Sequence, residues 1–136
     1  NGLTNCGRSP YLAVHQLEHA LSGEYDHVAH GAGLAVLYPV WCKYVYKENP
    51  ARFAQLARRV WDVVEADDEK AALMGIEAMS EYFKSIGMPS KLGEFGISED
   101  CIDRLVELCT FGGKRKINGY IELGEKELKE IFKMAF

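Results

Sequence analysis

The chain has 136 residues, of which 48% are hydrophobic, and its formal net charge is −4. This length and composition suit one domain with a proper buried core, and they exclude a disordered chain. The basic residues are scattered apart from the run 114–116, which we expect in a solvated loop. We therefore expect no nucleic-acid partner.

The sequence shows neither a membrane-spanning nor a targeting segment. Its longest apolar stretch, from Gly31 to Cys42, is too short to cross a bilayer and is interrupted by Pro39. The chain opens at Asn1 without a signal peptide, and we expect that its true start is missing. The four cysteines form no C-x-x-C pair, so we expect reduced, mostly packed thiols in a cytoplasmic protein.

Helical periodicity accounts for the first half of the chain. It predicts a helix from Tyr11 to about Ser22 and another from His30 to Val45, which Pro39 should kink. The pair Asn49-Pro50 is typical of a helix cap and first turn, so a third helix begins there. Its expected inward face comprises Phe53, Leu56, Ala57, Val60, Trp61 and Val64.

The second half predicts three more helices. One begins near Asp67 and is stopped by Gly87-Met88-Pro89, the next is capped by Ser98, and the last begins around Gly124. No β-alternation is longer than the stretch 116–123. The expected fold class is therefore an all-α helical bundle with at most a pair of short strands. The expected inward residues are Ala72, Ile76, Met79, Phe83 and Ile86, then Ile102, Leu105 and Leu108, and finally Leu128, Ile131, Phe132 and Ala135.

All four histidines lie within residues 15–30. Residues four apart share one face of a helix, so His15 and His19 lie one turn apart. The seven residues of the link 23–29 are long enough to bring His30 back level with His15. Histidine is the commonest metal ligand and the usual acid or base at neutral pH. The spacing therefore permits a site across two helices.

Small residues follow His30, in the run Gly31-Ala32-Gly33-Leu34-Ala35. Glycine lets a backbone approach another group closely. Such residues serve as often in contacts between helices as in contacts with a ligand. The sequence leaves both possibilities open.

The string from His15 to His19 also matches the H-x-x-E-H pattern of inverted zinc metallopeptidases. In those enzymes both histidines bind zinc and the glutamate is the general base. They also need a downstream glutamate as third ligand within a mixed α/β framework, whereas this chain offers only acids such as Glu94 or Glu99. A zinc metallopeptidase is one alternative function, and a non-catalytic helical binding module is another.

A longer pattern points elsewhere. Residues 15–41 read H-x-x-E-H-A-L-S-G-x-Y-D-x-x-x-H-G-A-G-L-A-V-L-Y-P-x-W, which resembles the metal-binding stretch of iron-dependent alcohol dehydrogenases, particularly the butanol dehydrogenase subgroup. The resemblance continues in residues 57–61, 83–89 and 130–136 and so covers the whole chain. It implies that residues 1–136 are a C-terminal helical metal-binding domain of the dehydroquinate synthase-like fold, without the N-terminal nucleotide-binding domain.

The resemblance also implies roles for particular residues. In the family, a metal ion lies among an aspartate, a histidine four residues later, and two later histidines that match His15 and His30. His19 matches a histidine near the nicotinamide and the substrate that has a role in proton transfer. Asp26 and His30 repeat the spacing of the family's first pair, but they follow His15 and His19, so this match is a coincidence.

The implied activity is that of an alcohol dehydrogenase or aldehyde reductase with NAD or NADP, with iron as the expected metal and zinc as an alternative. The full-length enzyme is expected to be a homodimer. His27 matches no family ligand and should be solvated, and Glu18 should support the histidine helix rather than bind metal. Because half of the ligands and the cofactor domain would lie upstream of Asn1, we expect this chain alone to be inactive and to bind metal weakly. The face with the histidines and Gly31 should be apolar or open, since it would line the cleft against the missing domain.

Overall fold

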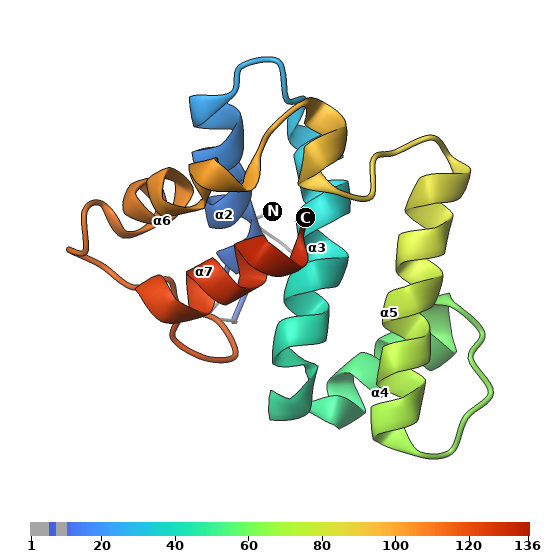
Figure 1. Ribbon diagram of the computed structural model, residues 1–136. Coiled ribbons are helices and arrows are strands. Elements are labelled where there is room, and N and C mark those ends of the chain that lie inside the picture. Colours follow the sequence, from blue (N-terminus) through green and yellow to red (C-terminus); the bar gives the residue numbers. More distant parts are fainter. Residues whose placement is uncertain (1–5, 8–10) are drawn as a thin grey trace.

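The computed structural model describes residues 6, 7 and 11–136, and Figure 1 shows an assembly of helices. An isolated antiparallel bridge between Ile117 and Leu123 is the β contact within these residues, at the place where the sequence predicted a short strand pair. The all-α fold class is confirmed. The helices are α2 (Ala13–Glu24), α3 (His30–Val45), α4 (Pro50–Val60), α5 (Asp68–Ser85), α6 (Ile102–Thr110) and α7 (Glu125–Met134), with the 3-10 helices η1 (Tyr46–Glu48), η2 (Leu92–Phe95) and η3 (Glu99–Cys101).

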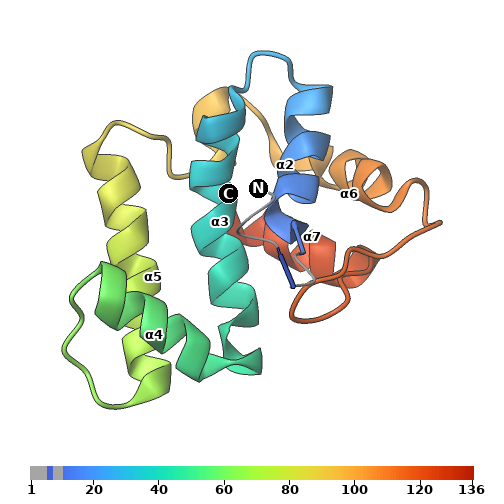
Figure 2. The same cartoon turned by 180° about the vertical axis from the view of Figure 1, so that it is seen from behind.

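Helix α3 runs through the middle of the molecule and separates two packed groups of helices (Figures 1 and 2). On one side it packs with α2 and α7, which also contact α6, and it contributes Val36 and Leu37 to the core that these helices share. On the other side it packs with the hairpin of α4 and α5, and it contributes Cys42 and Val45 to a second core. The helix continues through Pro39 to its end without a break.

Side-chain caps begin two of the helices where the sequence predicted them. At the start of α4, the backbone N–H of Arg52 donates to Oδ1 of Asn49 at 3.2 Å. At the start of α5, the backbone N–H of Lys70 donates to Oδ1 of Asp67 at 2.9 Å. These acceptors satisfy backbone donors that have no partner within the first turn of a helix.

The expected inward face of the third helix is partly wrong, because α4 ends at Val60. Val60 is 56% exposed and Val64 is 98% exposed. After the helix, Asp62 takes a positive φ of 52°, and the guanidinium of Arg58 holds the following loop by donating to the backbone oxygen of Glu65. The spacing of apolar residues does not reveal such a turn, so the prediction from the sequence extended the helix into the loop.

The next helix ends close to its predicted stop. Helix α5 ends at Ser85, and Gly87 follows with a positive φ of 78°. Ile86 is 51% exposed, so the expectation that it faces inward is wrong. The other expected inward residues of α5, α6 and α7 are buried or half-buried, as predicted.

The cysteines are free, and three of them are packed. Cys42, Cys101 and Cys109 are buried, whereas Cys6 is exposed. Burial raises the pKa of the Cys42 and Cys109 thiols to about 12. Among the residues described, no helix has both the length and the apolar character that crossing a membrane requires.

Candidate metal centre

Three of the four histidines meet beside the α2–α3 pair. His15 and His19 come from α2, and His30 is the first residue of α3. The ring of His30 lies 5.4 Å from that of His15 and 5.4 Å from that of His19, measured between centroids. The rings of His15 and His19 are 6.3 Å apart. The predicted return of His30 to the level of His15 is confirmed.

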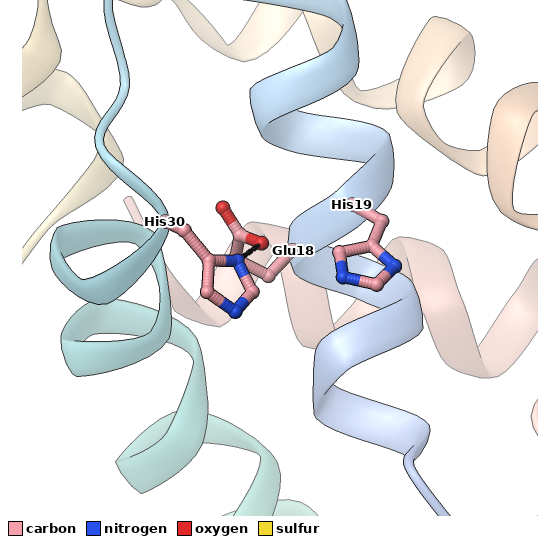
Figure 3. A group of neighbouring side chains, drawn as sticks. All are labelled: Glu18, His19 and His30. Atoms are coloured by element: carbon pink, nitrogen blue, oxygen red, sulfur yellow. Dashed lines mark hydrogen bonds and ion pairs between the residues drawn. The ribbon is translucent and has the colours of Figure 1, made fainter.

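Glu18 lies beside the histidines with its side chain fully buried. Its Oε2 forms a hydrogen-bonded pair with Nδ1 of His30, on the neighbouring helix (Figure 3). A carboxylate only accepts hydrogen bonds, so Nδ1 is the nitrogen that donates. The second oxygen, Oε1, is buried and has no hydrogen-bond partner among the described residues.

Space for the Glu18 side chain comes from Gly33, one turn into α3. A Cβ at Gly33 would lie 2.9 Å from both Cγ and Oε1 of Glu18, which is closer than side chains pack. Gly31, by contrast, has no atom of the described residues within 4 Å of its Cβ position. Of the two possibilities that the sequence left open, Gly33 therefore serves a contact between helices, made with a side chain of the histidine cluster.

The cluster fits a divalent metal ion. Ligand atoms from Glu18, His19 and His30 lie within 4.8 Å of one another, and the ring of His15 is beside them. Imidazole nitrogens suit iron and zinc. A buried carboxylate with an orphaned oxygen is costly unless a positive charge lies nearby, and an ion among the histidines would supply that charge.

The geometry leaves the ligand assignment as a prediction. The sequence predicted His15 and His30 as ligands and His19 as a catalytic residue near the nicotinamide. All three lie in the cluster, but the tightest group of ligand atoms includes His19 rather than His15. Two or three side chains are fewer than the four protein groups that the family resemblance implies, so the cluster has room for donors from outside the described residues.

Asp26 and the fourth histidine lie outside the cluster. Both are exposed in the turn between α2 and α3, in agreement with the solvated position expected for His27. The Nε2 atom of His27 is hydrogen-bonded to the backbone oxygen of Phe95 at 3.0 Å. The sequence had no signal for this contact, because the two residues are 68 positions apart.

Sequence reasoning also missed the partner of Glu18. We expected this residue to support the histidine helix to which it belongs, whereas it contacts His30 on the next helix. The H-x-x-E-H string marks the glutamate, but it assigns a different role to it. A useful signal was Gly33, since of the two glycines in the run 31–35 it is the one whose Cβ would strike Glu18.

The histidine face is open, as expected. His19 and Gly31 are exposed and His15 is half-buried, and a cleft of about 690 Å³ is lined at one end by His15 and Gly31. A smaller hollow of about 480 Å³ on the side of His19 is more polar and includes Arg104. The larger cleft runs between α3 and the α4–α5 hairpin, and its apolar lining includes Leu34, Tyr38, Leu56, Trp61, Phe83 and Met88.

Known proteins match both the sequence and the fold. Residues 5–136 match the sequence model described as "Fe-containing alcohol dehydrogenase family, C-terminal". The chain is 40% identical over 124 residues to "Probable NADH-dependent butanol dehydrogenase 1" of Bacillus subtilis, a match that covers 87% of this chain and 32% of that protein. It is 32% identical to NADH-dependent butanol dehydrogenase A of Clostridium acetobutylicum, over 100% of this chain and 35% of that one.

Among solved structures, NADH-dependent butanol dehydrogenase A from Thermotoga maritima superposes with a TM-score of 0.86 at 36% identity. That match covers 94% of this chain and 33% of the Thermotoga chain. The chain thus spans about a third of the length of the relatives it matches.

Proposed function

Because the chain belongs to the Fe-containing alcohol dehydrogenase family, we propose that it forms the metal-binding part of a nicotinamide-dependent enzyme that interconverts small alcohols and aldehydes. The names of the relatives favour NAD as the hydride carrier and an alcohol of the size of butanol as the substrate, with NADP as the alternative carrier. We place the nucleotide-binding domain in the part of the relatives' length that this chain does not span.

One observation carries the proposal: three histidines from two helices converge beside a buried carboxylate on an open face. We assign His15 and His30 as ligands of iron, with zinc as the alternative metal, and we expect the remaining ligands from the part of the relatives' length that this chain does not span. A divalent ion held there would polarise the substrate oxygen while hydride passes between the substrate carbon and the nicotinamide.

His19 has a different role in this proposal. It is exposed and lies beside His30 at the edge of the cluster. An imidazole exchanges protons near neutral pH, so a side chain in this position suits proton transfer at the substrate oxygen. We therefore assign His19 as the catalytic residue that faces the nicotinamide and the substrate.

The two alternative functions have less support. In a zinc peptidase of the H-x-x-E-H type, the glutamate has to activate a water molecule, but Glu18 is fully buried and paired with His30. Glu94, one of the proposed third ligands, accepts hydrogen bonds from Ser90 instead. A non-catalytic helical module has no feature in its favour beyond the chain's short length relative to the family.

Two further expectations stay predictions. The buried, unpaired thiols agree with a cytoplasmic location, because reducing conditions keep cysteines free. A homodimer of the full-length enzyme is expected from the family resemblance.

The proposal is tested by replacing histidines one at a time in the full-length protein. His15→Ala and His30→Ala should each strip the metal and abolish turnover, because each removes a ligand. His19→Ala should keep most of the metal and slow turnover by about 10²-fold or more, since a positioned general acid or base contributes that much. Asp26→Ala and His27→Ala are matched controls outside the cluster, and they should change neither quantity.

Metal content per subunit and the rate of nicotinamide absorbance change measure these outcomes. If His19→Ala loses metal while His30→Ala keeps it, the assignment is wrong. A full-length protein that turns over no alcohol or aldehyde with either cofactor would support the non-catalytic module. Residues 1–136 alone should show no turnover above background, because we place the nucleotide-binding domain in the part of the relatives' length that they do not span.

A further inference from the structure

We propose that Glu18 is a positioning residue that fixes the ring of His30 for metal binding, and that Gly33 keeps open the space that Glu18 needs. This inference rests on the proposed metal centre and adds the pair of residues that prepares it. Neither residue would contact the metal.

The contact between Glu18 and His30 determines which ring nitrogen is available. An imidazole has two nitrogens, and Nδ1 of His30 is occupied by Oε2 of Glu18. Figure 3 shows that Nε2 then points away from the carboxylate, into the space between α2 and α3. When Nδ1 donates to a carboxylate, Nε2 carries the lone pair that a metal requires, and the ring is held in one orientation.

Fold stability does not account for the buried carboxylate. The side chain of His30 is 48% exposed and that of Glu18 is fully buried, so the pair places a desolvated charge against a partner that water screens. Removing a carboxylate from water costs several kcal/mol, and replacing a buried ionic group by an apolar one of similar volume is often neutral or stabilising. A glutamate at this position therefore needs a function other than holding two helices together.

Direct metal binding by Glu18 fits the geometry less well than positioning does. One carboxylate oxygen is paired with His30. The other lies against α3, where a Cβ at Gly33 would come within 2.9 Å of it. Both oxygens thus face the neighbouring helix, so the carboxylate acts on the cluster through His30.

Gly33, on α3, leaves the space that the Glu18 side chain occupies. Alanine is normally more favourable than glycine inside a helix, so a glycine within α3 needs a reason. Its missing Cβ is the space in which Cγ and Oε1 of Glu18 lie. Gly33→Ala should push the carboxylate away from its position and turn the ring of His30.

The test uses the full-length protein, freed of metal and titrated with Zn²⁺ against a chelator and with Co²⁺ by visible absorption. Glu18→Met should weaken metal binding about 10- to 100-fold, the range found when a partner of a ligating histidine is removed. It should leave the urea midpoint of the metal-free protein unchanged or raised. Glu18→Gln keeps an oxygen that accepts from Nδ1, so it should retain most of the affinity and the Co²⁺ spectrum of the wild type.

Gly33→Ala is a second test of the inference, made from the α3 side of the contact. In the wild-type background it should weaken Zn²⁺ binding, and in the Glu18→Ala background it should cost nothing further, because the side chain it strikes is gone. Glu24→Gln on the same helix and Gly23→Ala, a helix glycine with open space around it, are matched controls that should bind Zn²⁺ like the wild type.

Each possible outcome separates the hypotheses. Unchanged Zn²⁺ affinity in Glu18→Met overturns the positioning role while the metal centre stands. If Glu18→Gln is as damaging as Glu18→Met and changes the Co²⁺ spectrum, Glu18 is a direct ligand and the inference is wrong. If Glu18→Met unfolds at lower urea without metal, the carboxylate is structural. A wild-type protein that binds neither metal overturns the proposed function together with this inference.

Discussion

The α2–α3 pair and the α4–α5 pair each place a helix glycine against a neighbouring helix, for different reasons. On α5, Gly75 lies against the backbone of α4: its Cβ would come 2.3 Å from Cβ and 2.7 Å from Cα of Ala57. On α3, the three atoms nearest to a Cβ at Gly33 all belong to the side chain of Glu18. The first glycine lets two helices approach, and the second gives room to a side chain of the site.

The polar side chains of the two helix pairs also differ in their hydrogen-bond partners. Between α4 and α5, the guanidinium of Arg58 donates to the backbone oxygens of Glu65 and Ala66 and to Asp68. Beside α2 and α3, one oxygen of Glu18 has no hydrogen-bond partner in the described part of the chain, and two of the three clustered histidines are exposed. The Arg58 guanidinium thus finds its acceptors within the hairpin, whereas the histidine cluster presents ring nitrogens that a metal ion could bind.

Gly75→Ala should cause the largest loss of stability. The new methyl group meets backbone atoms that cannot rotate away, and overpacking of this kind costs about 1–3 kcal/mol. We expect a lower urea midpoint and an unchanged Zn²⁺ affinity of the folded protein. Gly23→Ala is the control, and Ala57→Gly added to Gly75→Ala should restore part of the loss. A Gly75→Ala protein as stable as the wild type would show that the helices are not in close contact.

Removing the metal should affect the two regions unequally. A ligand at 100 times its dissociation constant stabilises the state that binds it by about 2.7 kcal/mol. In the full-length protein, chelation should therefore speed amide hydrogen exchange in α2 and the first turns of α3 and leave α4 and α5 unchanged. Equal acceleration in both regions would contradict a metal site confined to the histidine cluster.

Arg58→Ala should have the smallest of the three effects. It removes hydrogen bonds made by one partly exposed side chain, and water replaces part of what they contribute, so we expect a net loss of only about 1–2 kcal/mol in unfolding free energy. Arg58→Lys should restore little, because an ammonium cannot reproduce the planar fork. Urea unfolding measures both variants, and full stability in Arg58→Lys would show that charge alone matters here.

Local signals in the sequence were sufficient for much of the fold. Asn49 and Asp67 cap helices by accepting from backbone N–H groups three residues later, so both caps can be recognised from the sequence. The end of α4 was not predictable in this way, because it depends on a positive φ at Asp62 and on bonds from Arg58 to a loop that apolar periodicity does not describe.

In the candidate site too, contacts that follow from spacing along the chain were predictable, whereas a contact that depends on how helices pack was not. The spacing of His15 and His19 and the short link to His30 were enough to predict that the rings would meet. The partner of Glu18 was not predictable, since the contact with His30 depends on how α2 and α3 face each other. In the proposed metal centre, the choice of binding nitrogens would depend further on donors beyond the described residues.

The most direct test of the metal centre is a crystal structure of the iron-loaded full-length protein with diffraction data collected at the iron absorption edge. We predict one anomalous peak within about 2.0–2.3 Å of ring nitrogens of His15 and His30, the usual range for such ligands. Nε2 should be the binding atom of His30, and Glu18 should still be paired with its Nδ1. A peak bound by Glu18 and His19 without His15, or a peak away from the three histidines, would contradict the assignment.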